Sequence, residues 1–461
     1  MVGEAGAHAG APFGPIAAAR PDRRRAYCEP RIGDDGRNSL KVAVIGAGYV
    51  GLTTAACLAH LGHDVVAADV IPDKVDALND GKIPIVEDGL EDIVRGGRAD
   101  GRLRFVLGAA AAVDDAEFIF LCVPTPQGDD GSADMTYVES AAREVGPLLA
   151  SNSVVINKST VPVGSTHIVE RAIGRGDVFV VSNPEFLREG SAVRDFLHPD
   201  RIVIGADSQA AAIRVTELFG SIRAPVVVTD PPTAETIKYA SNAFLATKVS
   251  FINAIANVCE AVGANVREVV LGMGYDKRIG SEFLRPGPGW GGSCFPKDSH
   301  ALVRIAENAG YDFELLKGVI AVNEEQHERV AARVIALAGG SVDGKRLAVW
   351  GLTFKARTDD LRDSPALEVI ARLVKAGAVV RAYDPTRTAD LDGIEVAANA
   401  YDACEDAEVL VILTEWDEFR WLDLGVVRMH MATPRLFDAR AVIEPAAARR
   451  AGFVYAGIGV S

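Results

Sequence analysis

The chain contains few of the residues on which several protein classes depend. Its 461 residues include six cysteines and no Cys-x-x-Cys pair, so neither a disulfide framework nor a structural zinc site is expected. No apolar run approaches the roughly 20 residues that cross a membrane. Lysine and arginine total 48 against 63 aspartates and glutamates, a net charge of −15, which disfavours nonspecific binding to nucleic acid or an anionic membrane. We therefore expect a cytoplasmic protein that binds neither nucleic acid nor membrane.

The first 38 residues lack the apolar core of a secretory signal. They are rich in Ala, Gly, Pro and Arg, and the run Arg23-Arg24-Arg25 is not followed by a hydrophobic stretch. Neither a secretory nor a twin-arginine signal is therefore expected. We interpret residues 1–38 as a disordered N-terminal tail or as the product of an overextended start site.

The next segment carries a dinucleotide-binding fingerprint. A β-branched run over residues 41–45 precedes a G-x-G-x-x-G motif, a helical stretch and a second strand over residues 64–69. In this order Gly46 makes the tight turn, Gly48 admits the pyrophosphate and Gly51 packs the helix on the sheet. The pyrophosphate would rest on the helix N-terminus. The cofactor residues predicted from this motif are Gly46, Gly48, Tyr49, Val50 and Gly51.

The second strand ends in Asp69, which discriminates between cofactors. Its carboxylate would bind the adenosine ribose hydroxyls and repel a 2′-phosphate, which predicts NAD rather than NADP. Lys74, a little further along, either flanks the adenosine side or is a solvated helix lysine.

Three later apolar runs predict buried strands that end in polar, proline-containing loops. They cover residues 118–123, 154–157 and 178–181. Ligands bind at the carboxyl ends of the strands in a parallel α/β sheet. Thr125 and Thr160 are therefore predicted to face the cofactor and the reacting centre.

A domain boundary is expected at Pro231-Pro232. Apolar residues then recur with a 4-3-4-3 spacing, which predicts one long, well-packed helix over residues 234–262. A second helix is expected over about residues 313–337. After Gly339-Gly340 a strand–helix–strand pattern restarts without a glycine fingerprint, so no second dinucleotide is expected.

The predicted fold is α/β, with two Rossmann-type domains joined by a long central helix and a helical middle domain. Residues 39–230 would bind NAD, residues 231–338 would form the helical domain with a reactive cysteine, and residues 339–461 would form the second Rossmann-like domain.

The most informative segment is Gly291-Gly292-Ser293-Cys294-Phe295-Pro296, followed by Lys297-Asp298. The two glycines allow the backbone to approach a ligand closely. Pro296 opens an amphipathic helical run, so Cys294 would lie beside a helix N-terminus, whose dipole favours the thiolate. A nucleophilic cysteine is one interpretation, and a buried cysteine behind a glycine-rich turn is the other.

Two pairs of polar residues have helical or turn spacing. Lys238 and Asn242 share a face of the long helix and suit stabilisation of an oxyanion, with a charge from Lys238 and a directed hydrogen bond from Asn242. Glu185 and Glu189 follow a buried strand and could orient a hydroxyl substrate or relay a proton. Solvated surface residues are the alternative for each pair.

In this order, these segments resemble the UDP-glucose 6-dehydrogenases, within the wider nucleotide-sugar dehydrogenases. The resemblance extends from about residue 41 to the C-terminus, and the order of the segments makes it specific. It is carried by Gly46–Gly51, Val123–Pro126, Ser159–Gly164, Asn183–Gly190, Lys238–Asn242, Asp276–Gly280, Phe283–Asp298 and Phe354-Lys355.

The resemblance implies oxidation of a primary alcohol to an acid with two NAD⁺ and no metal. Cys294 would trap the aldehyde as a thiohemiacetal, and a second hydride transfer would give a thioester that water hydrolyses. Lys238 and Asn242 would stabilise the oxyanions, while the first proton acceptor is left open. Thr160, Glu189 and Asp298 would position the water, and the implied cofactor contacts also include Thr125, Thr160, Glu189, Lys297 and Arg362.

The same resemblance implies how UDP-glucose is bound. The segment from Phe186 to Glu189 would line the sugar, and Lys355 would reach an anionic group from a C-terminal, UDP-sugar-binding domain. Arg440 is a further candidate. In the family, the position of Arg278 reaches a neighbouring subunit's substrate, which implies a homodimer or a larger homo-oligomer. The implied substrate residues are Glu185, Phe186, Leu187, Arg188, Glu189, Lys238, Asn242, Arg278, Phe283, Leu284, Arg285, Pro286, Gly287, Gly291 and Lys355.

Three rival interpretations are open. A sister enzyme that acts on GDP-mannose or a UDP-N-acetylhexosamine would keep the mechanism, although Cys294–Asp298 and Arg188–Gly190 favour UDP-glucose. A two-electron hydroxyacid dehydrogenase would share the Rossmann unit but would have no use for Cys294. A catalytically inactive NAD-binding scaffold is disfavoured by the intact Cys294, Lys238, Asn242 and Asp298.

Overall fold

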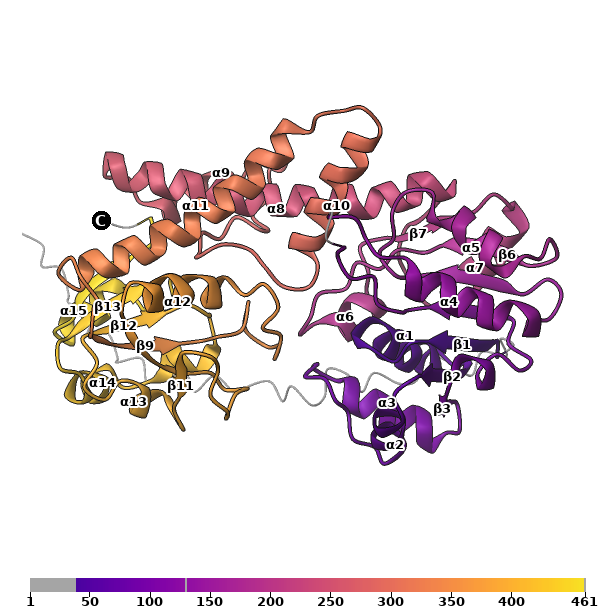
Figure 1. Cartoon of the computed structure of the whole chain (residues 1–461), viewed down its shortest axis with the longest axis horizontal. Coiled ribbons are helices and arrows are strands. Elements are labelled where there is room, and N and C mark those ends of the chain that lie inside the picture. Colours follow the sequence, from indigo (N-terminus) through magenta and orange to yellow (C-terminus); the bar gives the residue numbers. More distant parts are fainter. Residues whose placement is uncertain (1–38, 129–130, 460–461) are drawn as a thin grey trace, which may run out of the picture.

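The computed structural model describes residues 39–128 and 131–459, so the predicted tail over residues 1–38 lies outside the described residues. Two sheets dominate the chain, one in each half (Figure 1). The N-terminal sheet has the order β3-β2-β1-β4-β5-β6-β7-β8 and is parallel except between β6 and β7. Its strands are β1 (Lys41–Ile45), β2 (Asp64–Asp69), β3 (Leu103–Leu107), β4 (Phe118–Leu121), β5 (Val154–Asn157), β6 (Phe179–Ser182), β7 (Ile202–Gly205) and β8 (Val226–Thr229).

The C-terminal sheet is parallel throughout, with the order β11-β10-β9-β12-β13-β14. Its strand order is the one that the first six strands of the N-terminal sheet have, and it is the Rossmann order. The predicted α/β class with two Rossmann-type halves is therefore confirmed. The strands are β9 (Arg346–Trp350), β10 (Val379–Tyr383), β11 (Ile394–Val396), β12 (Val409–Ile412), β13 (Arg435–Asp438) and β14 (Val454–Gly457).

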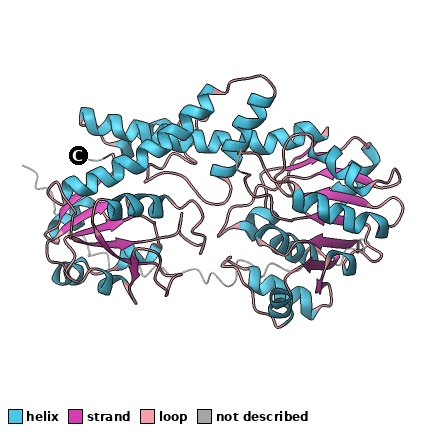
Figure 2. Cartoon of the chain, viewed as in Figure 1, coloured by secondary structure: helices cyan, strands magenta, loops and turns pink. Residues whose placement is uncertain are grey.

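Helices cover both faces of each sheet, and the two strand groups are separate (Figure 2). Apolar cores lie on both faces of the N-terminal sheet and of the C-terminal sheet. The N-terminal helices are α1 (Tyr49–His60), α2 (Pro72–Asn79), α3 (Leu90–Ala99), α4 (Thr136–Val145), α5 (Ser165–Ile173), α6 (Ala192–Leu197) and α7 (Gln209–Leu218). The C-terminal helices are α12 (Pro365–Lys375), α13 (Ala400–Ala403), α14 (Leu424–His430) and α15 (Pro445–Arg450).

Four helices connect the two sheet domains. They are α8 (Pro231–Val262), α9 (Val266–Gly274), α10 (Phe295–Asn308) and α11 (Glu314–Leu337). The α8 helix starts at the predicted proline pair because proline fits the first helical turn, and the Asp230 carboxylate caps it by accepting from Thr233 N. Both α10 and α11 pack along α8. The α8 helix spans the gap between the sheets, and α11 runs down over the C-terminal domain (Figure 1).

The long predicted helix exists, but it is not buried on all sides. Ile252 and Ala256 face the C-terminal core, whereas Phe244 and Phe251 are 65% and 50% exposed. Of the described helices, α8 alone has the length and apolar composition of a membrane span. Of its 18-residue apolar stretch, 33% is buried. A helix with one apolar face in a protein core and a second apolar face outside has the same composition.

Sequence patterning missed five of the described strands. Three of them, β8, β11 and β14, are weakly marked because they are short or carry exposed residues at sheet edges. Hydrophobic periodicity detects strands poorly when they are brief or solvated. The missed strands are β3, β7, β8, β11 and β14.

Candidate active site

A cavity of about 760 Å³ lies between the loop after β6 and the helices α8 and α10. Its lining brings together segments that are more than 100 residues apart in the chain. Lys158 and Arg201, which the sequence patterns did not single out, also face it. Eight of the predicted residues line it: Glu185, Phe186, Leu187, Arg188, Lys238, Asn242, Phe283 and Cys294.

A buried ion pair forms one wall of this cavity. Lys238 Nζ on α8 lies 2.9 Å from Glu185 Oε1, and the two side chains are 4% and 6% exposed. Burial opposes the charge on Lys238, but Glu185, Cys294 and Asp298 together raise its pKa. Burial likewise opposes the charge on Glu185, but Lys238 lowers its pKa overall. Both groups are therefore held in their charged forms.

Asn242 lies one turn after Lys238 and faces the same interior, as its spacing predicts. Its amide Nδ2 donates to Asp298 Oδ2 over 2.6 Å, and the same carboxylate accepts from Lys297 Nζ over 2.7 Å. Asp298 is almost fully buried. This link joins α8 to the first turn of α10, which begins beside Cys294.

Cys294 is the N-cap residue of α10, with a proline in the first turn. The expected position at a helix N-terminus is therefore present, but the expected thiolate is not favoured. Burial raises the pKa of the Cys294 thiol to about 11, while Lys238 lowers it and Glu185 and Asp298 raise it. Desolvation of the sulfur outweighs the helix terminus and the ammonium.

The two glycines before Cys294 have neighbours other than those expected. A Cβ on Gly291 would lie 1.8 Å from Asp363 O, and a Cβ on Gly292 would lie 2.8 Å from the Phe354 ring. Their small size thus permits contact with the C-terminal domain rather than with an open ligand site. Gly292 N also donates to Arg362 O over 3.1 Å.

Glu189 does not line the cavity and lies instead where three parts of the chain meet. Its carboxylate accepts from Ser293 Oγ over 3.1 Å and from Thr358 Oγ1 over 2.9 Å. Arg362 lies 3.4 Å away. Burial and the charge of Asp360 raise the pKa of Glu189. Of the two predicted carboxylates, Glu185 is thus the one beside Lys238 in the cavity.

The glycine turn has the geometry of a dinucleotide site. Gly46 has a φ of 95°, and a Cβ on Gly51 would lie 1.8 Å from Gly46 O, so both positions require glycine. A Cβ on Gly48 would meet no described atom within 4 Å, which leaves space in front of the α1 N-terminus. A pyrophosphate fits such a terminus.

Asp69 lies beside this turn and is already bonded. It accepts from Ala47 N over 3.0 Å and from Ile71 N over 3.1 Å, and Lys74 Nζ lies 2.7 Å away. Burial opposes its charge, but the contact with Lys74 lowers its pKa. Lys74 thus contacts Asp69 directly, so the two predicted adenosine-side residues form one pair.

Tyr49, inside the glycine motif, is linked to Gly190 in the loop after β6. Its hydroxyl bonds to the Glu87 carboxylate, and Gly190 N donates to both groups. Glu87 was not predicted, because no local pattern distinguishes it from a surface acid. Thr125 and Thr160 also meet, since Thr125 Oγ1 donates to Thr160 O over 2.8 Å. Neither threonine lines the cavity.

The predicted UDP-binding segment lies against the central helices and the C-terminal domain. Leu284 is buried, and Gly287 N donates to Asn253 Oδ1 over 2.8 Å. Arg440 lies against Gly287 and donates to Phe354 O. Arg285 is exposed and Pro286 is half-buried.

Lys355 is half-buried and has no ion-pair partner among the described residues. Its ammonium lies 5.2 Å from the centre of the Phe354 ring. Burial lowers the pKa of Lys355, although Glu189 and Glu415 raise it. A cation that lacks a partner in this setting suits an anionic ligand.

Arg278 does not reach the cavity of its own chain. It is exposed and paired with Asp276 over 2.6 Å. The structure therefore brings most predicted residues to one region but leaves Arg278 on the outer surface.

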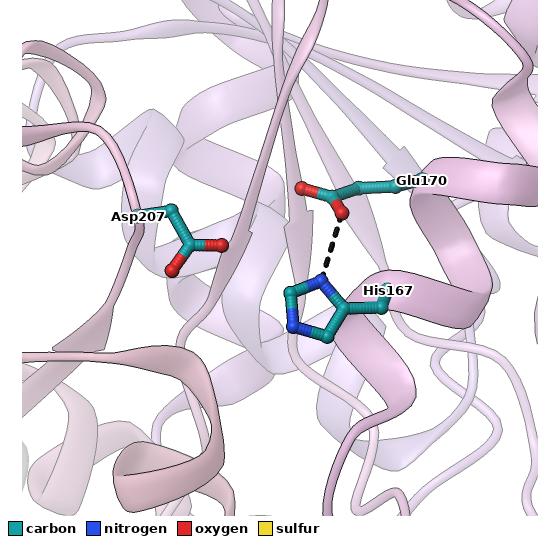
Figure 3. Close-up of side chains that lie close together, drawn as sticks. All are labelled: His167, Glu170 and Asp207. Atoms are coloured by element: carbon teal, nitrogen blue, oxygen red, sulfur yellow. Dashed lines mark hydrogen bonds and ion pairs between the residues drawn. The ribbon is translucent and has the colours of Figure 1, made fainter.

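Among the described residues, one group has potential metal-ligand spacing. His167 and Glu170 of α5 lie beside Asp207, with ligand atoms within 4.8 Å of one another (Figure 3). His167 Nδ1 is 2.9 Å from Glu170 Oε2. None of the three lines the cavity.

Three sequence models of one family match successive parts of the chain. They are the NAD binding domain, the central domain and the UDP binding domain of the UDP-glucose/GDP-mannose dehydrogenase family, over residues 40–223, 232–325 and 348–445.

Whole-length relatives agree with these matches. The UDP-glucose 6-dehydrogenase of Rhizobium meliloti (strain 1021) is 47% identical, over 91% of this chain and 99% of the relative. UDP-glucose 6-dehydrogenase TuaD of Bacillus subtilis (strain 168) is 44% identical, over 91% and 93%. A solved UDP-glucose dehydrogenase from Pyrobaculum islandicum has a TM-score of 0.85 and 38% identity, covering 93% of this chain and 100% of that one.

Proposed function

The chain belongs to the UDP-glucose/GDP-mannose dehydrogenase family, and from this premise we propose how its residues carry out the reaction. It is an NAD-dependent oxidoreductase that oxidises UDP-glucose. Conversion of the C6 alcohol to the carboxylate of UDP-glucuronate removes four electrons. Two NAD⁺ and one water are therefore consumed, and two NADH and three protons are released.

Cys294 is the proposed covalent nucleophile. The observation that carries this proposal is its position in the cavity wall, where its sulfur interacts with the charge of Lys238. When bound, NAD would supply the hydride acceptor for each oxidation at C6. The Cys294 sulfur bonds to the aldehyde carbon after the first oxidation, and the second oxidation leaves a thioester on the same sulfur. Water then cleaves the carbon–sulfur bond and restores the thiol.

Lys238 and Asn242 would stabilise the negative oxygen that forms at each addition to C6. Both side chains face the cavity, and a fixed ammonium is effective in a buried site. Asp298 holds the amide of Asn242 in place and is the proposed acceptor for the proton of the hydrolytic water. Glu185 is the proposed proton acceptor for the first oxidation, because it is an ionised carboxylate on the cavity wall.

The UDP moiety would lie across the segment from Phe283 to Gly291, between the central helices and the C-terminal domain. Lys355 and Arg440 would contact its diphosphate from the C-terminal domain. The unpaired ammonium of Lys355 supports this assignment. NAD would occupy the glycine turn, with Asp69 at the adenosine ribose.

We propose a homodimer in which α8 supplies the contact surface. Phe244, Phe251 and Val258 are 65%, 50% and 55% exposed at spacings of seven residues, so they form one apolar stripe. The exposed Arg278 would reach the partner subunit's substrate. Sedimentation velocity tests this arrangement, and Phe251→Arg should give monomers.

We also propose that the chain forms three domains, over residues 39–230, 231–338 and 339–461. A cytoplasmic location is also proposed. The free cysteines Cys57, Cys122, Cys259, Cys294 and Cys404 fit a reducing compartment.

The decisive experiment measures NADH released per sugar nucleotide, with excess NAD⁺ and limiting UDP-glucose. Two NADH without free aldehyde would support covalent capture by Cys294. One NADH would refute it. Turnover only with GDP-mannose or a UDP-N-acetylhexosamine would keep the mechanism and change the substrate.

A further inference from the structure

Formation of the bond between the Cys294 sulfur and carbon requires that the thiol lose its proton, and burial opposes this loss. Because burial keeps the thiol protonated at neutral pH, free thiolate is scarce, and a base must remove the proton as the sulfur attacks. Lys238 stabilises the thiolate but, as an ammonium, has no lone pair with which to accept the proton. A proton acceptor must lie within hydrogen-bonding range of the sulfur.

Ser293 is the residue that contacts the sulfur. Its Oγ lies 3.6 Å from Cys294 Sγ, within hydrogen-bonding range for sulfur, and 3.1 Å from Glu189 Oε1. A serine hydroxyl has one proton and two lone pairs. When it donates its proton to Glu189, its lone pairs can accept from the thiol. The hydroxyl therefore connects the nucleophile to a carboxylate that the cavity itself does not contact.

The surroundings of Glu189 favour its protonated form. Its side chain is 11% exposed, and Asp360 on the C-terminal domain is an adjacent negative charge. A second carboxylate nearby and little water both increase proton affinity. Thr358 and Arg362 fix the carboxylate so that Oε1 stays directed at Ser293.

We propose that Ser293 relays the thiol proton of Cys294 to Glu189 as the sulfur attacks the aldehyde. The S–H bond breaks and its proton passes to Ser293 Oγ, while the original hydroxyl proton passes to Glu189 Oε1. As the sulfur–carbon bond forms, the carbonyl π bond breaks and its electron pair moves to the aldehyde oxygen. The products are a thiohemiacetal oxyanion, stabilised by Lys238 and Asn242, and a neutral carboxylic acid at Glu189, so charge and protons balance. During the attack the proton now on Ser293 Oγ stabilises the partial negative charge on the sulfur. This inference rests on the covalent function proposed for Cys294.

Other charged groups set the protonation of the two ends of the relay. The groups that act on Cys294 are Lys238, Glu185, Asp298 and Arg362, and those that act on Glu189 include Asp360, Arg362, Lys355 and Tyr49. None of them bonds to the Ser293 hydroxyl. The relay therefore predicts that one hydroxyl group controls the ionisation of Cys294.

The test measures the rate of Cys294 alkylation by iodoacetamide against pH, without NAD or substrate, with Cys294→Ser as the blank for other thiols. In Ser293→Ala the alkylation profile should move to higher pH, with a rate about tenfold lower at neutral pH. Turnover should fall about 100-fold. Ser293→Thr keeps a hydroxyl and should recover the wild-type profile. Melting temperatures check that the variants fold.

Glu189→Gln provides the second arm, because it keeps the hydrogen bond from Ser293 but removes the base. If the relay operates, Ser293→Ala and Glu189→Gln shift the alkylation profile by similar amounts and are not additive when combined. A wild-type profile in folded Ser293→Ala would overturn the relay, as would independent, additive shifts. A wild-type yield of one NADH per UDP-glucose would instead overturn the covalent function, so the two failures are distinguishable.

Discussion

The two sheet domains share a strand order and a glycine turn, but the segments after the turn differ. Gly46 N bonds to Ala68 O before Asp69, and Gly351 N bonds to Tyr383 O before Asp384, each over 2.8 Å. In the N-terminal domain α1 starts at once, at Tyr49. In the C-terminal domain α12 starts only at Pro365.

The delayed helix changes the use of the domain. A helix N-terminus directly after the turn makes an anion site for a dinucleotide. The C-terminal domain has instead a loop over residues 353–364, which brings Thr358 and Arg362 into contact with Glu189 of the N-terminal domain. The longer segment after the turn thus forms a loop that contacts Gly291 and Gly292, at the place where the N-terminal domain has its helix N-terminus.

The two equivalent aspartates show the same divergence. Asp69 accepts from two backbone amides and Lys74, and it lies beside open space at Gly48. Asp384 is fully buried and accepts from Leu352 N, Thr353 N and the Trp416 indole. The Asp69 carboxylate lies beside the space proposed for the cofactor, and the Asp384 carboxylate is enclosed within its domain.

Cys294→Ser should have the largest effect, because the proposed reaction depends on a covalent bond between the Cys294 sulfur and the substrate. Turnover should fall by more than about 1,000-fold, since a hydroxyl is a poor replacement for the sulfur nucleophile. Binding of NAD⁺ and of UDP-glucose should persist in calorimetry. Full activity would contradict covalent catalysis.

Asp384→Ala should destabilise the protein by about 3 kcal/mol, because it leaves several buried donors without an acceptor. Urea unfolding should show the loss, while the affinity for NAD⁺ measured on the folded variant should be unchanged. A weakened NAD⁺ affinity would mean that the C-terminal domain contributes to the cofactor site after all.

Asp69→Ala should have the opposite pattern. It should weaken NAD⁺ binding about tenfold, equivalent to roughly 1.4 kcal/mol, through loss of the bonds to the adenosine ribose. Its effect on unfolding should be smaller than that of Asp384→Ala, because Asp384 also accepts from Thr386 N and from the Thr353 and Thr386 hydroxyls. An unchanged Michaelis constant for NAD⁺ would refute the ribose role.

Lys355→Met should give the smallest effect, a rise of several-fold in the Michaelis constant for UDP-glucose with that for NAD⁺ unchanged. Because burial lowers the pKa of Lys355, its charge is present at low pH and is lost as pH rises through that lowered pKa. Binding of UDP-glucose should therefore weaken at alkaline pH, and Lys355→Arg should move this loss to higher pH. An identical pH profile in Lys355→Arg would exclude the lysine.

Local sequence pattern was sufficient to predict most of the elements on which the site residues lie. The glycine turn, the strand ending at Asp69 and the α8 face with Lys238 and Asn242 follow from short-range spacing, which backbone sterics and helical periodicity translate directly into geometry. The missed strand β8 has exposed valines at a sheet edge, where no alternation between a buried and a solvated face marks a strand.

The roles of individual residues were harder to predict from the sequence. Glu185 and Glu189 have the same spacing logic, yet one pairs with Lys238 in the cavity and the other meets Ser293 and Thr358 at a domain junction. Nothing within the segment distinguishes them, because each partner comes from another domain.

By itself the sequence determined the fold class, the NAD fingerprint and the presence of a cysteine at a helix start, since each depends on residues close together in the chain. Only the tertiary structure decided which carboxylate faces the cavity, that Gly291 and Gly292 pack against the C-terminal domain, and that the Cys294 thiol is held protonated. The physical reason is that burial and Coulomb interactions depend on groups within a few ångströms in space, and folding brings those groups from distant parts of the chain.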